Sequence, residues 1–103
     1  MITQISKEYA EALFELALGG NNVAEVTEAM ETVERELAEN PAYLDTLASP
    51  AILREQRVAS LEAVFGDSVP KTALALLRMM VSRGHARAIP DMIPAYEKLA
   101  SEF

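Results

Sequence analysis

Apolar residues recur at the spacing of an α-helix along almost the whole chain, and no stretch alternates convincingly between apolar and polar residues as a β-strand would. The clearest example is residues 23–39, where glutamates surround a single apolar stripe. The stripe consists of Val23, Val26, Met30, Val33 and Leu37. This pattern predicts an all-α protein.

Turn and cap residues divide the chain into six predicted helices. The sequence predicts helices over about residues 4–18 and 23–39, a short one from Pro41 to before Ser49-Pro50, one over about 53–65, one from Val69-Pro70 to before Gly84, and a last one that carries Ile89 through Phe103. We expect Gly19 to adopt the left-handed conformation after the first helix. We also expect Asn22 and Asn40 to cap the second and third helices.

The apolar spacing also predicts which side chains face the core. In the helix over 53–65 the inward residues are Val58, Leu61, Val64 and Phe65. In the last helix they are Ile89, Met92, Ile93, Tyr96, Ala100 and Phe103. Pro94 lies among them, so either Asp91 is the N-cap and Pro94 falls in the tolerated first turn, or the helix kinks at Pro94.

The chain is expected to form one domain. It has 103 residues, of which 50% are hydrophobic and 24% are charged, the balance of a packed globular domain. No internal repeat, low-complexity run or linker interrupts it. We therefore predict a compact single-domain bundle of six helices, joined by short loops, over residues 1–103.

Charge and cysteine content exclude several classes of function. The formal net charge is −7, and clustered lysine and arginine are confined to one stretch between Lys71 and Arg87, so we expect no nucleic-acid partner. The longest run without a charged residue, residues 16–24, is too short to cross a membrane, so we expect no direct membrane insertion. The absence of cysteine excludes disulfides and cysteine metal sites and fits a reducing compartment.

No arrangement of residues indicates catalysis or metal binding. His85 is the single histidine, and it follows Gly84, where a lone imidazole usually interacts with the carbonyl groups of a helix end. The glutamates of residues 25–36 follow the solvent face of a predicted helix and form no calcium-binding loop. Neither a phosphate-binding glycine loop nor a Gly-x-Ser-x-Gly motif is present. We expect no catalytic residue, no cofactor and no metal, which leaves a helical interaction module.

The first predicted helix is apolar around more than half of its circumference. Two sets of apolar residues lie on nearly opposite sides of it: Ile5, Tyr9, Ala12 and Leu16 on one, and Ala10, Phe14, Ala17 and Leu18 on the other. A helix at the edge of a small bundle needs only one apolar stripe. This helix is therefore either central to the bundle or in contact with something outside the domain.

The fifth predicted helix has a second apolar row beside its core stripe. The core stripe is Val69, Ala73, Leu76, Leu77 and Met80, and the second row is Thr72, Ala75 and Met79, with Arg83 beyond them. Small residues beside a methionine form a shallow, adaptable surface on which a partner helix can dock. The alternative is that Met79 is a single exposed apolar residue, which is common on protein surfaces.

Five segments resemble the ATP synthase delta subunit family, which includes the mitochondrial oligomycin-sensitivity-conferring protein. Residues 9–17, YAEALFELA, resemble the family's opening helix. The other four follow in the family's order and extend the resemblance over nearly the whole chain. They are Asn40-Pro41 leading to Ser49-Pro50-Ala51-Ile52, Leu61-x-x-Val64-Phe65-Gly66, Leu76-Leu77 with Arg83-Gly84, and Arg87-x-Ile89-Pro90 with Tyr96. Two departures concern Pro94, where family members usually continue a helix, and Leu53, where many have a Ser or Thr cap.

The resemblance implies a non-catalytic stator subunit. The family's N-terminal six-helix domain binds the N-terminal helix of an alpha subunit on its first and fifth helices. Tyr9, Ala12 and Met79 match the partner-facing positions, and the helix projections add their neighbours. The predicted site is therefore Ile5, Tyr9, Ala12, Leu16, Thr72, Ala75 and Met79.

The resemblance also implies a second, stalk-binding domain that these 103 residues lack. That domain clasps the b subunit of the peripheral stalk, so we expect the chain to be an excised N-terminal domain. We expect the complex to lie at the cytoplasmic face of the bacterial plasma membrane, with this subunit peripheral. Two alternatives are a stand-alone helical adaptor or regulator that binds another amphipathic helix, and a small helical enzyme subunit, which the missing nucleophile and metal ligands disfavour.

Overall fold

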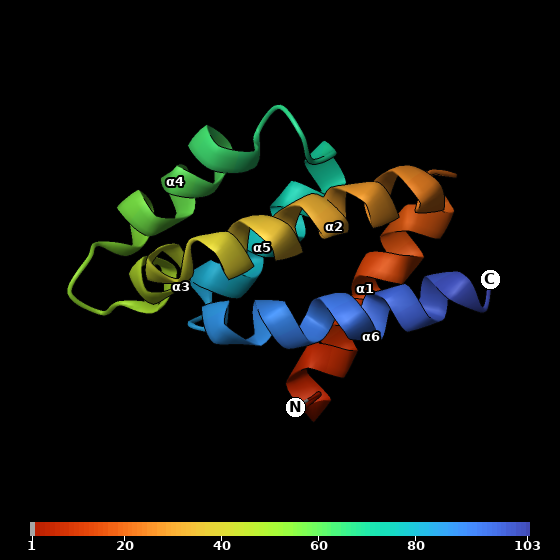
Figure 1. The fold of residues 1–103 in the computed structure, drawn as a ribbon, viewed down its shortest axis with the longest axis horizontal. Helices are drawn as coiled ribbons and strands as arrows, with labels where there is room; N and C mark the ends of the chain where they lie inside the picture. The colour runs from red at the N-terminus through yellow and green to blue at the C-terminus, as the bar shows by residue number, and fades with distance from the viewer. Residues whose placement is uncertain (1) are drawn as a thin grey trace.

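Six α-helices and one short 3₁₀ helix make up the computed structural model, which describes residues 2–103 (Figure 1). They are α1 (Gln4–Gly19), α2 (Val23–Glu39), α3 (Pro41–Ala48), α4 (Arg54–Phe65), α5 (Lys71–Ser82), η1 (Ala86–Ala88) and α6 (Ile89–Ser101). Residues 2–103 contain no β-strand, so the predicted all-α bundle is confirmed. Nowhere in those residues is a helix both long and apolar enough to span a membrane. The Cα radius of gyration, 12.6 Å, is that of a compact domain of this length.

The first helix, α1, lies inside the bundle. It crosses behind α6 in Figure 1 and also contacts α5 and α2. Tyr9, Ala10, Leu13 and Ala17 are buried along it. One face of α1 is therefore packed inside the bundle, whereas Ile5 and Leu16 on its other face are 43% and 41% exposed, so a central position accounts for only part of its apolar surface.

A capping box fixes the beginning of α1. The Ser6 N–H donates to Thr3 Oγ1 at 3.1 Å, and the Thr3 N–H donates to Ser6 Oγ at 2.8 Å. Both backbone donors would otherwise lack a partner inside the helix. Ser6 is fully buried, so this cap belongs to the packed interior rather than to the surface.

The core draws side chains from all six helices. Its largest fully buried members include Tyr96, Phe65, Leu13, Met30, Leu47 and Met80. Tyr96 brings a hydroxyl into this interior, where it donates to the Val23 carbonyl oxygen at 3.1 Å and lies 3.1 Å from Thr27 Oγ1. Burial raises the Tyr96 pKa, so this hydroxyl stays protonated and keeps α6 joined to α2.

The turn after α1 differs from the prediction in which residue is left-handed. Gly19 belongs to α1, and the positive φ of 54° is found at Asn21. The Asn22 N–H donates to the Ala17 carbonyl (3.0 Å) and the Asn21 N–H to the Leu18 carbonyl (3.1 Å), which is a Schellman motif. Asparagine tolerates the left-handed conformation, so the helix extends through Gly19 before it turns.

Asn22 and Asn40 occupy the predicted N-cap positions, but neither side chain makes a capping hydrogen bond. The buried Asn22 Oδ1 has no hydrogen-bond partner within residues 2–103. Asn40 instead donates from its side-chain amide to Glu36 at 3.3 Å. Both cap predictions were therefore right about position and wrong about the bond, because neither residue has the extended backbone angles typical of an N-cap (ψ is 39° at Asn22 and 70° at Asn40).

A second Schellman motif ends α5. Gly84 has a φ of 80°, and its N–H donates to the Val81 carbonyl at 3.1 Å. The His85 N–H donates to the Met80 carbonyl at 2.7 Å. This turn needs a residue without a Cβ at its left-handed position, and it directs His85 toward α1.

The last helix begins before Asp91, so the alternative with Asp91 as its N-cap is wrong, and Pro94 lies within the helix as the other alternative required. α6 starts at Ile89, so Asp91 lies in its first turn rather than at its N-cap. Pro94 lies inside the helix, which continues through it without interruption. Because proline has no N–H, the carbonyl of Pro90, one turn earlier, lacks its usual hydrogen bond within the helix.

Two residues predicted to be buried are exposed instead. Val64 is 42% exposed because α4 packs through the narrow pair formed by Leu61 and Phe65. Phe103 is 76% exposed because α6 ends at Ser101, and the helical spacing does not continue beyond it. The ring of Phe103 nevertheless lies edge-on to Phe14, with ring centroids 5.9 Å apart.

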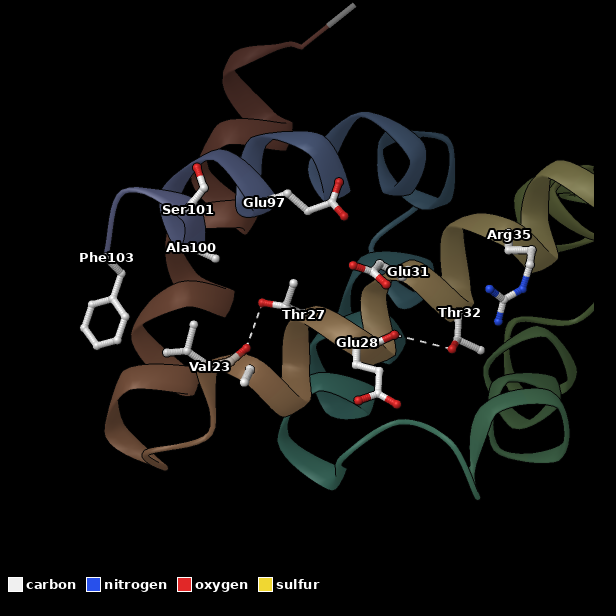
Figure 2. A pocket seen from close by; sticks show the side chains of 11 residues that line it. Val23, Thr27, Glu28, Glu31, Thr32, Arg35, Glu97, Ala100, Ser101 and Phe103 are labelled. Atoms are coloured by element: carbon white, nitrogen blue, oxygen red, sulfur yellow. Dashed lines mark hydrogen bonds between the residues drawn. The ribbon is translucent and has the colours of Figure 1, made fainter.

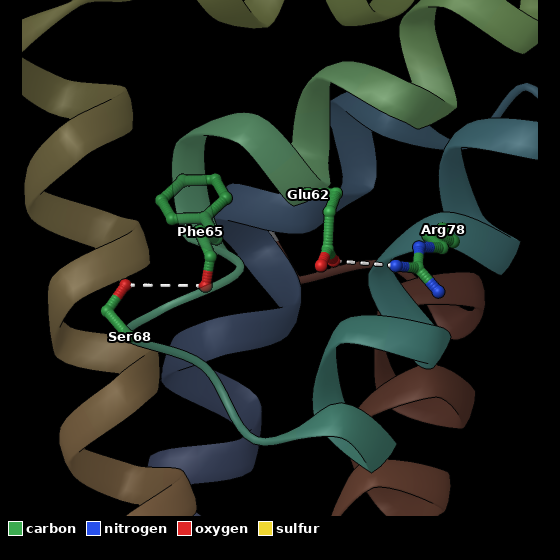
Figure 3. Close-up of polar contacts among 4 residues, drawn as sticks. All are labelled: Glu62, Phe65, Ser68 and Arg78. Carbon is green, nitrogen blue, oxygen red and sulfur yellow. Dashed lines mark hydrogen bonds and ion pairs between the residues drawn. The ribbon is translucent and has the colours of Figure 1, made fainter.

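An ion pair joins α4 to α5 on the surface. Glu62 of α4 accepts from Arg78 of α5 at 2.7 Å, as Figure 3 shows. At the end of α4 the hydroxyl of Ser68 lies 3.5 Å from the Phe65 carbonyl oxygen (Figure 3). The Arg78 guanidinium is therefore held toward α4.

Candidate functional site

A groove of about 590 Å³ lies between α1 and the C-terminal half of α5. Its lining consists of Ile5, Glu8, Tyr9, Ala12, Glu15, Leu16, Leu76, Met79, Arg83 and His85, and we call it the α1–α5 groove. Five of the seven predicted partner-facing residues are among them. The groove is open to solvent along its length, so it has the form of a docking surface rather than of an enclosed ligand cavity.

The α1 wall is apolar because four of its residues share one helical face. Ile5 and Leu16 are 43% and 41% exposed, whereas Ala12 is half-buried and Tyr9 is buried except for its edge. The spacing of four, three and four residues keeps all of them on one side of the helix. The small Ala12 between two larger side chains leaves room for the close approach of another helix.

The α5 wall consists of one buried and one exposed apolar side chain. Leu76 is buried at the base of the groove, and Met79 is 41% exposed. Thr72 and Ala75, which were also predicted for the site, are exposed on α5 but do not line the groove. Thr72 lies about two turns before Met79 on the same face, and Ala75 is rotated away from Leu76 by about 100°.

Tyr9 and His85 are joined at the base of the groove. The Tyr9 hydroxyl lies 2.8 Å from His85 Nδ1, and the two rings meet edge to face with centroids 5.6 Å apart. Sequence reasoning assigned His85 to the carbonyl groups at the end of α5 and missed this contact. Gly84 was the available signal, because a left-handed glycine turns the next residue out of the helix.

Charged side chains line the rim of the groove. Glu8 and Glu15 belong to the α1 wall, and Arg83 lies at the C-cap of α5. All three are exposed. The groove therefore combines an apolar base with acidic groups on one side and a guanidinium on the other.

The chemistry of the groove fits an amphipathic helix. An apolar groove between two helices, bordered by polar groups, accepts the apolar face of a third helix. Residues 2–103 contain no group of three or more histidine, cysteine, aspartate or glutamate side chains that could hold a metal ion. The adaptable thioether of Met79 and the exposed Ile5 and Leu16 supply area that a partner would bury.

A larger hollow of about 910 Å³ lies between α2 and α6 but has a different character. Figure 2 shows Glu97 of α6 and Glu31 of α2 directed toward one another across it. Burial, followed by the charges of Glu34 and Glu31, raises the Glu97 pKa above its usual value. Because its walls are acidic, this hollow is a poorer match than the α1–α5 groove for an apolar helix face.

Comparison with known proteins places the chain beside one family. The sequence model of the family described as ATP synthase delta (OSCP) subunit matches residues 5–103. The ATP synthase subunit delta of Alkalihalophilus pseudofirmus is 30% identical over 98 residues, which cover 95% of this chain and 54% of that protein.

Other proteins described as ATP synthase subunit delta show similar sequence identity and coverage. The ATP synthase subunit delta of Bacillus licheniformis is 32% identical over 99 residues, covering 96% of this chain and 53% of that protein. The subunit of Chloroherpeton thalassium is 30% identical over 101 residues, covering 98% and 55%. The chain thus spans about half the length of the curated relatives that it matches.

Proposed function

This chain belongs to the ATP synthase delta (OSCP) subunit family, and on that premise we propose that it is a non-catalytic component of an F-type ATP synthase. The match extends over residues 5–103, and the relatives bear the name of the delta subunit. The domain contributes to the stator, which links the F1 head to the peripheral stalk and supports proton-driven ATP synthesis. Its contribution is mechanical, since it holds subunits together.

The α1–α5 groove is the observation that carries the proposed contact. We assign it to the N-terminal helix of the alpha subunit. The exposed Ile5, Leu16 and Met79 offer apolar area, and the half-buried Ala12 allows close approach of the two backbones. Exposed apolar side chains gathered in one groove favour a docking role over chance exposure, because single exposed apolar residues are normally scattered.

The other proposed partner is the b subunit of the peripheral stalk, through a further domain. Relatives of this family are about twice as long as these 103 residues. In that arrangement the domain lies at the periphery of the membrane complex, on the cytoplasmic face of the bacterial plasma membrane. The helical bundle then connects the head to the stalk.

A stator contact has to withstand the torque that the rotating shaft exerts on the catalytic hexamer. A contact of this kind gains most of its strength from apolar area removed from water. A bundle whose contact helix is also its central helix transmits load directly into the core. The central position of α1 meets this requirement, because the face opposite the groove packs against α6.

Substitution of Ala12 tests the proposal. A synthetic peptide with the N-terminal residues of the cognate alpha subunit is titrated into the purified domain, and binding is measured by calorimetry. We expect saturable one-to-one binding that Ala12→Asp weakens by about 100-fold or more, because the new carboxylate is buried without a partner beneath the docked helix. Helical circular dichroism should not change, since Ala12 is only half-buried.

Ala63→Asp is the matched control, because Ala63 is an exposed alanine on α4 outside the groove. It should bind the alpha peptide as the wild-type domain does. If the folded Ala12→Asp domain binds as tightly as the control, the groove is not the contact. If the folded wild-type domain does not bind the peptide at all, the proposed contact is wrong, and the faces of α1 and α5 serve another partner, as in an adaptor or regulator, or only the core.

A further inference from the structure

The two walls of the α1–α5 groove carry opposite charge. Glu8 and Glu15 line the α1 side, and Arg83 lines the α5 side. We infer that the groove accepts its helix in one direction only, with basic residues of the helix along the α1 wall and a carboxylate against the α5 wall. This inference rests on the proposed helix-docking function and adds the charge pattern and the polarity of the partner.

The α1 wall presents two carboxylates that form no ion pair with a cationic side chain of residues 2–103. Glu8 and Glu15 are seven residues apart, so they lie on one face about 10.5 Å from each other along the helix. Glu8 accepts only a long bond from the Gln4 side-chain amide, at 3.4 Å. Glu15 forms no side-chain hydrogen bond or ion pair within residues 2–103. Two lysine or arginine side chains about seven residues apart on a docked helix match this spacing.

The α5 wall presents one guanidinium, that of Arg83, whereas the other arginine of this region, Arg78, already has a partner. Arg78 is paired with Glu62 of α4 at 2.7 Å (Figure 3) and does not line the groove. Arg83 lines the groove, and its side chain has no hydrogen bond or ion pair with any other residue of 2–103. An aspartate or glutamate on the corresponding edge of a docked helix would pair with it.

The direction of docking follows from this asymmetry. An apolar stripe alone fits the groove in either direction, because the apolar base has no polarity of its own. Reversal of the helix exchanges its two edges, which would place its carboxylates against Glu8 and Glu15 and its cation against Arg83. Like charges across an interface disfavour that arrangement, so the rim supplies specificity while the base supplies affinity.

Two designed 20-residue peptides test the charge pattern. Both have the same apolar stripe of leucine and alanine; one has lysine along one edge and glutamate along the other, and the second has glutamate along both. We expect the wild-type domain to prefer the first peptide by about tenfold, as for two or three exposed ion pairs. The preference should shrink in high salt, because these charges are exposed.

Charge-reversal variants of the domain distinguish the effect of the groove-rim glutamates from the effect of the domain's net negative charge. In the double variant Glu8→Lys with Glu15→Lys the preference should disappear or reverse. The matched control is Glu11→Lys with Glu39→Lys, two exposed glutamates outside the groove, which changes the net charge equally. The control should keep the wild-type preference. If both double variants change the peptide preference equally, the inference is overturned, because general attraction of a basic peptide to an acidic domain would then explain the preference.

The direction in which the peptide docks can be determined from the distance between one spin label on the domain and another on the peptide. The sequence has no cysteine, so Leu18→Cys, an exposed position at the end of α1 outside the groove, carries a single nitroxide. A second nitroxide lies at the N-terminus of the lysine–glutamate peptide. Since α1 is about 24 Å long, the two directions give clearly different distances in double electron–electron resonance.

We expect the wild-type domain to give the distance of one docking direction. The triple variant that combines Glu8→Lys, Glu15→Lys and Arg83→Glu should give the distance of the opposite direction. Two distances of equal weight in the wild type would overturn the inference, as would failure of both peptides to bind a folded domain. The alpha-peptide titration stays independent of these measurements. If that peptide binds in the groove while edge charge has no effect, the inference fails and the proposed function stands; if it does not bind, the proposed function fails.

Discussion

Thr3 and Asn22 stand at the beginnings of α1 and α2, and only one of them caps its helix through its side chain. Thr3 Oγ1 accepts from the Ser6 N–H at 3.1 Å, whereas Asn22 Oδ1 is buried and has no hydrogen-bond partner within residues 2–103. An N-cap bond is typically worth about 1 kcal/mol. A buried oxygen without a partner instead lowers stability, because its bonds to water are lost on folding.

The two residues should therefore respond differently to alanine. We expect Thr3→Ala to lower the free energy of unfolding by about 1 kcal/mol, and Asn22→Ala to lower it by less than about 0.5 kcal/mol or to raise it. Urea denaturation followed by circular dichroism measures both. A loss at Asn22 as large as that at Thr3 would show that the asparagine caps α2 in solution.

At the scale of elements, the beginning of α4 has no side-chain cap and is instead fixed to the preceding segment by Arg57, a residue of α4 itself. Arg57 donates from Nε to the Ile52 carbonyl at 2.9 Å and from a terminal nitrogen to the Leu47 carbonyl at 3.3 Å. These bonds join α4 to the end of α3. The N-cap position is occupied by Leu53, which is 67% exposed and offers no acceptor.

Leu53→Ser should therefore stabilise the domain. Leu53 already has extended backbone angles, φ −56° and ψ 138°, which suit an N-cap, and Gln56 lies at the third helical position, where its side chain can complete a capping box. We expect the free energy of unfolding to rise by about 0.5–1 kcal/mol. Leu53→Ala removes the same exposed side chain without adding an acceptor. A serine variant no more stable than the alanine variant would contradict the prediction.

The helices were easier to predict than the turns that join them. The apolar period of residues 23–39 located α2 with its observed bounds, because one continuous stripe determines both the face and the extent of a helix. The turn at Asn21 depends instead on a left-handed residue and two carbonyl acceptors, which several neighbouring residues could equally have supplied. Local spacing does not choose among such alternatives.

The candidate groove was predictable in its apolar part and not in its polar part. Excess apolar surface on α1 and α5 indicated Ile5, Ala12 and Met79 before any contact was known. The pairing of Tyr9 with His85 joins residues 76 positions apart, so helical periodicity carries no information about it. Thr72 and Ala75 lie outside the groove, whose lining from α5 begins only at Leu76.

The whole molecule is acidic, and its charge is uneven. The formal net charge is −7, and α2 together with Glu97 of α6 brings several carboxylates around one hollow (Figure 2). Glu97 is the member whose pKa is raised, first by burial and then by the charges of Glu34 and Glu31. Stability of the domain should consequently vary with pH through this side chain.

Removal of the Glu97 charge should stabilise the domain at neutral pH. The native pKa of Glu97 lies above its ordinary value of 4.5, so the native state binds its proton more tightly than the unfolded state, and the free energy of unfolding falls as pH rises through that range. Glu97→Gln, which cannot ionise, should raise the free energy of unfolding at pH 7 by up to about 0.5 kcal/mol, the scale of a few surface like-charge contacts. As the pH falls below about 4.5, Glu97 becomes protonated in the unfolded state as well as in the native state, and the advantage should shrink toward zero. Urea denaturation at a series of pH values measures this, with Glu39→Gln, an exposed glutamate at the end of α2 outside the hollow, as the control. An advantage for Glu97→Gln that persists unchanged at pH 4 would show that the amide stabilises the domain through packing rather than charge.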